Sequence, residues 1–327
     1  MPSLETALRE IMSGRMPEGE VSSFLTTLRD RGETVEEVTA AASVMREFAV
    51  KSGWSLEEGV DTCGTGGDQK GTFNISTAAA FVVAGAGVKV AKHGNRSVSS
   101  QCGSADLLEA LGVKIDLPPE SVKKCVDDTG IGFFFAPRYH PAMKNVAAVR
   151  KKIGTRTIFN LLGPLLNPAG VRHQVIGVFD QKWIEPMARV AARLGSSHVL
   201  VVHGEDGLDE ITLTGPTTVA EFKNERVIHP KISTFVVQPE DFGFKLCSLE
   251  DLRGGDAKEN ASTLKAVLEG LEGPIRDVVI LNAAAALVAV GRAEDWHQGV
   301  LLAKRSLDHG TALNCLQKMV EVSNRDS

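Results

Sequence analysis

The sequence lacks the cysteine spacing of a disulfide framework or a zinc site. Its five cysteines are scattered, and no two of them form a Cys-x-x-Cys pair. An odd number of unpatterned cysteines is typical of reduced thiols. We therefore expect a cytoplasmic protein in which Cys63 and Cys102 are small buried side chains rather than ligands.

Long apolar runs and an excess of positive charge are missing too. Lys89 and Lys92 interrupt the most apolar stretch, so no segment reaches the about 18 apolar residues of a membrane span. Glu5, Arg9 and Glu10 do not fit a signal peptide. The net charge of −5 argues against broad nucleic-acid binding, which needs a basic face. The sequence thus predicts neither membrane nor nucleic acid as a partner.

Repeats and flexible linkers are also absent, and two hydrophobic patterns divide the chain. Up to about residue 57, apolar residues recur at helical spacing, as Leu4, Leu8 and Ile11 do. From residue 60, short apolar runs alternate with helical stretches, which predicts a parallel sheet flanked by helices. The expected strands are 60–63, 88–91, 131–135, 174–179, 199–202, 211–213, 218–222 and 226–228. The expected later helices are 35–50, 77–86, 105–111, 140–153, 157–162, 183–194, 257–271, 275–290, 295–307 and 311–322.

The most informative pattern is the stretch 61–68, where three of four consecutive residues are glycine, followed by Asn, Ser and Thr within 71–77. Glycine lets the backbone approach a ligand closely, and a helix start presents N–H groups at its positive end. Such a loop and helix bind phosphate. The spacing is neither that of a Walker loop nor that of a dinucleotide fingerprint. A simple tight turn is the alternative.

A second polar stretch, 92–100, strengthens the phosphate interpretation. It follows an apolar run and places two cations, a histidine, an amide and three hydroxyls within nine residues. A solvated turn needs no such variety. The stretch that follows, 103–112, has the capping pattern of another helix and ends in glycine.

Six motifs together resemble the anthranilate phosphoribosyltransferase family, which joins anthranilate to phosphoribosyl pyrophosphate in tryptophan biosynthesis. They lie, in the family's order, at 64–68, 74–77, 92–96, 140–143, 160–169 and 207–210, and past about residue 214 the likeness is only general. The resemblance implies an α/β fold similar to that of nucleoside phosphorylases. It comprises a small helical domain, 1–58 with 139–168, and a larger α/β domain, 59–138 with 169–327. The larger domain has a mostly parallel central sheet flanked by helices, and the active site lies between the domains.

The resemblance implies that the glycine-rich stretch binds phosphoribosyl pyrophosphate. When the bond between ribose C1 and pyrophosphate breaks, loop N–H groups and Lys92 would stabilise the negative leaving group. Asp68 is itself anionic, so we expect it to hold the loop or to contact a ribose hydroxyl or metal-bound water. The implied residues are Gly64, Thr65, Gly66, Gly67, Asp68, Thr72, Asn74, Ser76, Thr77, Lys92, Gly94, Asn95, Arg96, Ser97 and Ser104.

The implied anthranilate site needs a cation for the carboxylate and an apolar slot for the ring. Arg150 matches the arginine of the family, although a surface cation beside Lys151 and Lys152 is the alternative. The other implied residues are Gly64, His93, Asn95, Pro137, His140 and Met143. No hydrolase-type Ser/His/Asp order occurs. The arylamine is already neutral, so no catalytic residue is assigned, and His93 as a proton acceptor stays open.

Asp209 and Glu210 follow the expected strand 199–202 in an acidic loop. Mg²⁺ prefers oxygen ligands and commonly takes one or two carboxylates plus substrate phosphates. The resemblance implies that these two residues and Ser76 hold Mg²⁺. From the residues alone, a solvated acidic turn is the alternative.

Two other functions are weighed against phosphoribosyl transfer. One is that of a pyrimidine nucleoside phosphorylase, which also acts at ribose C1. The other is a non-enzymatic nucleic-acid-binding relative, which the negative charge and the intact loops disfavour. The resemblance also implies a homodimer formed through the N-terminal helices, where we expect more apolar side chains than a small domain can bury. An anthranilate synthase subunit is considered as a further partner.

Overall fold

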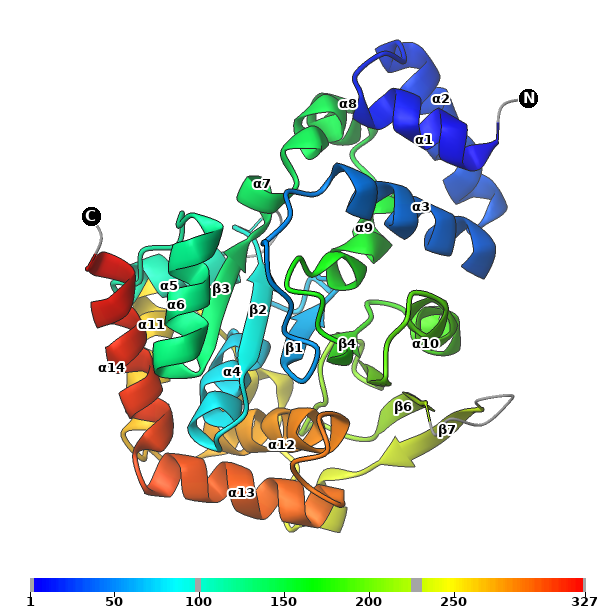
Figure 1. Ribbon diagram of the computed structural model, residues 1–327. Helices are drawn as coiled ribbons and strands as arrows, with labels where there is room; N and C mark the ends of the chain where they lie inside the picture. Colours follow the sequence, from blue (N-terminus) through cyan, green and yellow to red (C-terminus); the bar gives the residue numbers. More distant parts are fainter. Residues whose placement is uncertain (1–2, 98–100, 225–230, 326–327) are drawn as a thin grey trace.

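A mostly parallel β-sheet forms the centre of the molecule. The computed structural model describes residues 3–97, 101–224 and 231–325. Within these ranges seven strands pair in the order β3-β2-β1-β4-β5-β6-β7. Strands β1 to β5 are parallel, whereas β6 and β7 pair antiparallel at one edge (Figure 1). The strands are β1 Val60–Gly64, β2 Val90–Gly94, β3 Ile131–Phe135, β4 His173–Gly177, β5 His198–Gly204, β6 Thr217–Lys223 and β7 Ile232–Val237.

Helices cover both faces of this sheet. Helix α4 (Ile75–Gly85) and helix α12 (Pro274–Ala289) are apolar on nearly all sides, are buried, and pack against each other. Helix α10 (Ile184–Arg193) covers the opposite face. The other helices of this region are α5 Ser104–Ala110, α6 Pro119–Thr129, α11 Ala257–Leu268, α13 Trp296–Asp308 and α14 Thr311–Asn324. In the described part of the chain, no helix is both long and apolar enough to cross a bilayer.

The N-terminal helices join segments from far along the sequence. They are α1 Leu4–Met12, α2 Glu18–Arg31 and α3 Val35–Phe48, and α3 starts with a capping box. Helix α8 (Lys144–Ile153) packs against α1 and α2, and the short α9 (Phe159–Leu162) packs against α3 (Figure 1). A small helical domain beside a larger α/β domain, as the sequence predicted, is confirmed.

Most apolar side chains of the N-terminal helices are covered within the single chain. Leu8, Ile11, Leu25 and Leu28 are at most 5% exposed. They share one core with side chains of β4, β5 and α10, so the larger domain helps to cover them, whereas Leu4 and Phe24 are half-buried. Their number therefore gives no argument for a dimer.

Several expected elements need correction. Residues 211–213 are not a strand, because the main-chain groups of Ile211 bond to the Asn282 side chain. The expected helix 140–153 begins as a 3-10 turn, Pro141–Met143, and only α8 is α-helical. The expected helix 157–162 is reduced to α9. Helix α6 and strand β7 were not predicted, and the expected strand 226–228 lies outside the described residues.

Candidate active site

The predicted donor and metal residues lie near the carboxyl edge of the parallel sheet, whereas Arg150 lies in α8 and Met143 in the turn before it. Gly64 at the end of β1 pairs with Gly177 of β4, which pairs with Val202 of β5. Strand β2 ends at Gly94 beside Phe135 of β3. The loops that follow these strands therefore meet along one edge, where open α/β sheets bind their ligands.

The glycine-rich loop after β1 closes onto the acidic loop after β5. The Gly66 N–H donates a hydrogen bond to Asp209 Oδ2 at 2.7 Å. A Cβ at Gly64 would lie 2.3 Å from the same oxygen, and a Cβ at Gly177 would lie 1.6 Å from the Asp209 main-chain oxygen. Only glycine at both strand ends lets Asp209 come this close.

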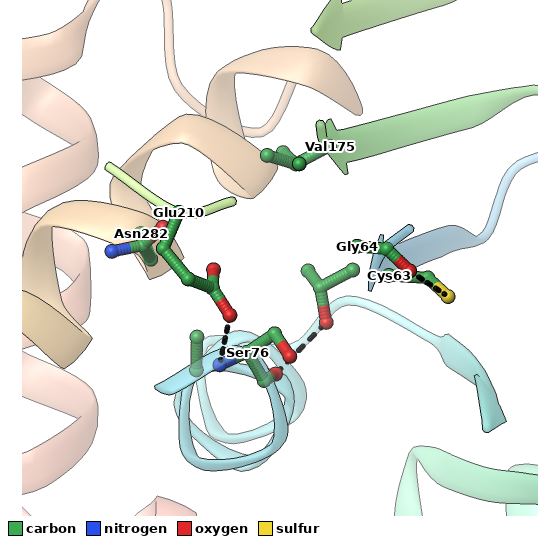
Figure 2. Close-up of a pocket in the computed structure, with 9 residues that line it drawn as sticks. Cys63, Gly64, Ser76, Val175, Glu210 and Asn282 are labelled. Atoms are coloured by element: carbon green, nitrogen blue, oxygen red, sulfur yellow. Dashed lines mark hydrogen bonds between the residues drawn. The ribbon is translucent and has the colours of Figure 1, made fainter. Parts of the chain in front are cut away.

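Glu210 faces the first turn of α4. The Ser76 N–H donates to Glu210 Oε1 at 3.2 Å, and Figure 2 shows the carboxylate pointing at the helix start. Burial raises the pKa of both Asp209 and Glu210, and the neighbouring carboxylates, Asp68 for Asp209 and Asp209 for Glu210, raise it further. A divalent cation would relieve this repulsion, since it favours the charged form of both groups.

The donor set at this edge fits Mg²⁺. Asp209 and Glu210 supply two carboxylates, and the Ser76 hydroxyl lies at the same helix start. Over the described ranges, no group of three or more His, Cys, Asp or Glu side chains converges on one point. The pair therefore leaves positions for phosphate oxygens and water, which is the usual coordination of Mg²⁺.

Lys92 lies under the start of α4. The residue is 3% exposed, and Nζ donates to the Thr62 carbonyl oxygen and, at 3.3 Å, to Ser76 Oγ. Burial raises the pKa of nearby Asp61 to about 6, although the Lys92 charge opposes that shift. Lys92 thus brings positive charge to the helix start that carries the Glu210 contact. Its contact with phosphate stays a prediction.

Asn74 connects three segments around the same helix start. Its Nδ2 donates to the Cys102 carbonyl oxygen at 3.0 Å, and its Oδ1 accepts from Asn260 Nδ2 of α11 at 3.0 Å. Thr72 forms an isolated antiparallel bridge with Arg253. These bonds tie the loop after β1 to the C-terminal third of the chain, so Asn74 has a structural role beside its predicted role in binding.

The loop after β2 is held to the start of α5. The predicted residues here are Gly94, Asn95, Arg96, Ser97 and Ser104. The Arg96 guanidinium pairs with Asp106 at 3.1 Å and with Glu109. Ser104 Oγ donates to the Asn95 carbonyl oxygen at 3.3 Å. Two carboxylates balance the Arg96 charge, which favours an ordering role for Arg96, and its phosphate contact stays a prediction.

Two predicted acceptor residues form a buried histidine pair. The ring centroids of His93 and His140 are 5.2 Å apart in an edge contact, and His93 Nδ1 lies 3.1 Å from the Gly163 carbonyl oxygen. Burial lowers the pKa of His93 to about 3 and that of His140 to about 4, so both rings are neutral at pH 7. Pro137 in α7 (Ala136–Tyr139) and Met143 lie in the short turns that adjoin His140.

Arg150 differs from its neighbouring cations. It is half-buried in α8, and its guanidinium carbon lies 5.6 Å from the Phe159 ring centroid. Burial lowers its pKa. No carboxylate in the described residues pairs with Arg150, whereas Lys152 pairs with Glu18. A partly desolvated arginine without an anion is better placed to receive a ligand carboxylate than a surface cation is.

Asp61 is a central residue that the sequence did not single out, although it begins the glycine-rich stretch. It is fully buried and accepts hydrogen bonds from the His93 N–H at 3.2 Å and from Asn167 Nδ2 at 2.8 Å. Asn167 also donates to the Ala91 carbonyl oxygen at 2.8 Å. Asp61 therefore joins β1, β2 and the segment after α9 beneath the predicted acceptor residues.

Arg156 is a second residue at the site that the sequence patterns did not indicate. Its guanidinium donates to the Gly67 carbonyl oxygen and stacks 3.9 Å from the Phe179 ring centroid. The Phe179 N–H in turn donates to Thr65 Oγ1 at 3.1 Å. A basic residue in the helical insertion, residues 139–168, is thus bound to the glycine-rich loop, and no local sequence pattern indicated this contact.

A small cavity separates the ends of β1 and β4 from the start of α4. Its lining residues are Thr62, Cys63, Gly64, Ser76, Ala79, Val175, Gly177, Glu210 and Asn282 (Figure 2). Cys102 is buried as expected, but Cys63 is half-buried at this cavity. Burial raises the pKa of Cys63 to about 12, so its thiol is neutral.

Comparison with known families defines the class of protein. Residues 3–49 match the model of the helical bundle domain of a glycosyl transferase family, and residues 56–313 match that of its α/β domain. The chain is therefore a member of this glycosyl transferase family. Both matches agree with the fold, in which N-terminal helices precede the sheet.

Individual relatives narrow the class. The chain is 54% identical over 319 residues to the anthranilate phosphoribosyltransferase of Bradyrhizobium sp. (strain ORS 278), covering 98% of this chain and 93% of that protein. Anthranilate phosphoribosyltransferase from Thermus thermophilus superposes with a TM-score of 0.90 at 43% identity, over 98% and 94% of the two chains. The Saccharomyces cerevisiae enzyme, solved in complex with PRPP and Mg, gives a TM-score of 0.88 at 32% identity, over 98% and 92%. The chain belongs to the anthranilate phosphoribosyltransferase family, which confirms the resemblance seen in its motifs.

Proposed function

We infer that this chain transfers the phosphoribosyl group of 5-phosphoribosyl 1-pyrophosphate to anthranilate, which gives N-(5-phosphoribosyl)anthranilate and pyrophosphate. The observation that carries the proposal is the contact of Gly66 with Asp209 and of Ser76 with Glu210 at one sheet edge. A glycine loop, a helix start and an acidic pair together suit a metal-bound pyrophosphate. The reaction places the enzyme in tryptophan biosynthesis.

The donor side stabilises the leaving group. As the bond at ribose C1 breaks, negative charge grows on pyrophosphate, and preorganised donors at the glycine loop and α4 would bind it. Lys92 adds a buried positive charge behind this helix start. Mg²⁺ held by Asp209, Glu210 and Ser76 would supply charge neutralisation when bound.

The acceptor side holds anthranilate by its carboxylate and ring. Arg150, which pairs with no carboxylate among the described residues, would receive the carboxylate, and the neutral pair His93 and His140 would lie beside the ring. The neutral arylamine attacks C1 without prior deprotonation, and the proton that its nitrogen loses after the new bond forms passes to water or to the released pyrophosphate. The pKa of His93, lowered to about 3 by burial, makes this ring a poor acceptor for that proton. The chain then acts by holding both substrates in the reacting geometry.

The chain is proposed to form two domains and to assemble as a dimer. The helical domain comprises 1–58 with 139–168, and the α/β domain comprises 59–138 with 169–327, with the substrates between them. The packing of α8 on α1 and α2 supports this division. The proposed assembly is a homodimer in the cytoplasm, and an anthranilate synthase subunit remains a proposed partner.

A fluorescence assay tests the function. Anthranilate fluorescence should fall when phosphoribosyl pyrophosphate and Mg²⁺ are added together, and not when either is omitted. Phosphorolysis of uridine or thymidine without any reaction of anthranilate would instead indicate a pyrimidine nucleoside phosphorylase. Relatives from Bradyrhizobium, Rhodopseudomonas palustris and Xanthobacter autotrophicus are anthranilate phosphoribosyltransferases, so they give that alternative no support.

A further inference from the structure

Asn282 is a buried amide in the apolar helix α12. The residue is 2% exposed, and its neighbours along the helix are buried alanine, valine, leucine and isoleucine. A buried amide without partners would cost stability, so the bonds that it makes identify its role. Oδ1 accepts from the Ile211 N–H at 3.0 Å, and Nδ2 donates to the carbonyl oxygens of Ile211 and Val278 at 2.8 and 2.9 Å.

Both main-chain groups of Ile211 are therefore held by one side chain, as a neighbouring strand would hold them. Ile211 directly follows Glu210, so its N–H belongs to the peptide that joins the two residues. Asn282 and Glu210 also line the same small cavity, and Figure 2 shows them close together beside α4. The amide thus fixes the backbone from which the Glu210 carboxylate extends.

Asp206, on the other flank of the acidic pair, makes a second set of bonds that joins the two flanks of the loop. Asp206 Oδ2 accepts hydrogen bonds from the hydroxyls of Thr212 and Thr214, both at 2.6 Å, and Asp206 Oδ1 accepts from the Leu208 N–H at 3.1 Å. These bonds shape the loop on itself, but they do not connect it to a helix. The Asn282 bonds connect the loop to the core, next to the metal-binding carboxylates.

We propose that Asn282 is a positioning residue that orients Glu210 and Asp209 toward the metal–pyrophosphate group. This inference rests on the proposed function. Asparagine is suited to the place because its amide accepts from the N–H and donates to the carbonyl oxygen of one residue, Ile211. Leucine has a similar size and removes all three bonds, whereas aspartate would lose the donor and add charge beside Glu210.

The test compares Asn282→Leu with wild type in two ways. The first is the rise in Tm on adding pyrophosphate with and without Mg²⁺, which needs no turnover. The second is the Mg²⁺ concentration for half-maximal rate at saturating donor. We expect Asn282→Leu to weaken Mg²⁺ binding about tenfold, as loss of a group that orients a metal ligand does. The Tm rise with pyrophosphate alone and the anthranilate KM should stay at wild-type values.

Thr129→Val is a matched control. Thr129 is buried, and its Oγ1 bonds the Cys125 carbonyl oxygen at 2.7 Å and both main-chain groups of Ile131 at 3.0 and 3.3 Å. It repeats the Asn282 pattern at the amino end of β3, away from the site. The variant should lower the Tm while leaving the Mg²⁺ dependence unchanged.

The outcomes separate the inference from the proposed function. A folded Asn282→Leu variant with wild-type Mg²⁺ dependence overturns the inference, and so does an equal loss in Thr129→Val. Asn282→Ser, which is smaller and cannot reach Ile211, serves if the leucine variant does not fold. A wild-type protein that is stabilised by Mg²⁺ and pyrophosphate but transfers nothing to anthranilate overturns the function. In that case, a loss of the stabilisation in Asn282→Leu still supports the inference.

Discussion

Arg150 is the residue on which the choice of acceptor most depends. Its guanidinium is half-buried over Phe159 and lacks a carboxylate in the described residues. Arg150→Ala should raise the anthranilate KM by about ten- to a hundredfold, because a hydrogen bond to a charged group contributes roughly 1.5–3 kcal/mol. The donor KM should hardly change. Steady-state kinetics with each substrate varied separately measure both, and exposed Lys151→Ala is the control. An unchanged anthranilate KM would make Arg150 a structural cation.

A substitution at Gly66 tests whether the glycine-rich loop binds the donor. Its φ is 69°, and a Cβ there would meet no atom within 4 Å, so an alanine would strain the backbone and occupy space meant for phosphate. Gly66→Ala should raise the KM for phosphoribosyl pyrophosphate at least about tenfold and leave the anthranilate KM near its wild-type value. Gly291→Ala is the matched control, with a φ of 72° and equally open space. Equal losses for both substrates would indicate general damage to the fold.

The acidic loop after β5 should make the stability of the protein depend on pH. Burial and mutual repulsion raise the folded-state pKa of Asp209 and Glu210 above the unfolded value. The stability that these groups contribute is thus fully present below their unfolded pKa, about 4, and is lost as pH rises through the raised folded values. Without metal, Asp209→Asn with Glu210→Gln should therefore raise the Tm at pH 8 by about 2 °C or more, and change it much less at pH 5.

The measurement is a pair of thermal melts at each pH with and without Mg²⁺ and pyrophosphate. Wild type should regain stability at pH 8 when both are added, since the cation favours the ionised pair, and the double variant should not. A double variant that melts below wild type at pH 8 without metal would show that the carboxylates stabilise the empty loop.

Local patterns predicted the elements that carry the strongest periodicity. The glycine-rich stretch, the buried strands β1 to β5 and the C-terminal helices follow from apolar spacing and glycine. Residues 211–213 looked like a strand because Ile211 and Leu213 are apolar, but the partner of Ile211 is the Asn282 side chain, 71 residues away. Strand β7 is largely exposed and α6 is half polar, so neither gave an apolar signal. Spacing cannot show tertiary hydrogen bonds such as those of Asp61 and Arg156.

Contacts between the helical insertion and the sheet set the position of the predicted acceptor residues relative to the donor loops. His93, near the carboxyl end of β2, contacts Gly163, and Asp61, near the start of β1, contacts Asn167. These contacts connect the predicted acceptor residues to the strands that carry the donor loops.

The proposed homodimer is a property of the whole molecule that can be measured directly. Light scattering at micromolar concentration should give about twice 34.9 kDa, and a mass of one chain would contradict it.

Arg156 offers the sharpest test of the contact between the helical insertion and the glycine-rich loop. Its side chain is exposed, so its loss should not disturb the core. It contacts Gly67 through a hydrogen bond and Phe179 through a cation–π interaction. An exposed cation–π contact contributes about 0.5–1 kcal/mol, so Arg156→Ala should raise the donor KM about two- to fivefold. Arg156→Lys should recover part of this effect, since an ammonium can still donate to Gly67.

Hydrogen exchange measures the mobility of the glycine-rich loop directly, which steady-state kinetics cannot do. If Arg156 restrains the glycine-rich loop, amides of 65–70 should exchange faster in Arg156→Ala, whereas those of β3 should be unaffected. Arg15→Ala, which breaks an exposed ion pair with Glu10 on the N-terminal helices, is the control. Unchanged exchange at 65–70 together with a wild-type donor KM would mean that the stacked guanidinium merely lies on the surface. The helical insertion would then influence the donor loop only through the buried bonds of His93 and Asp61.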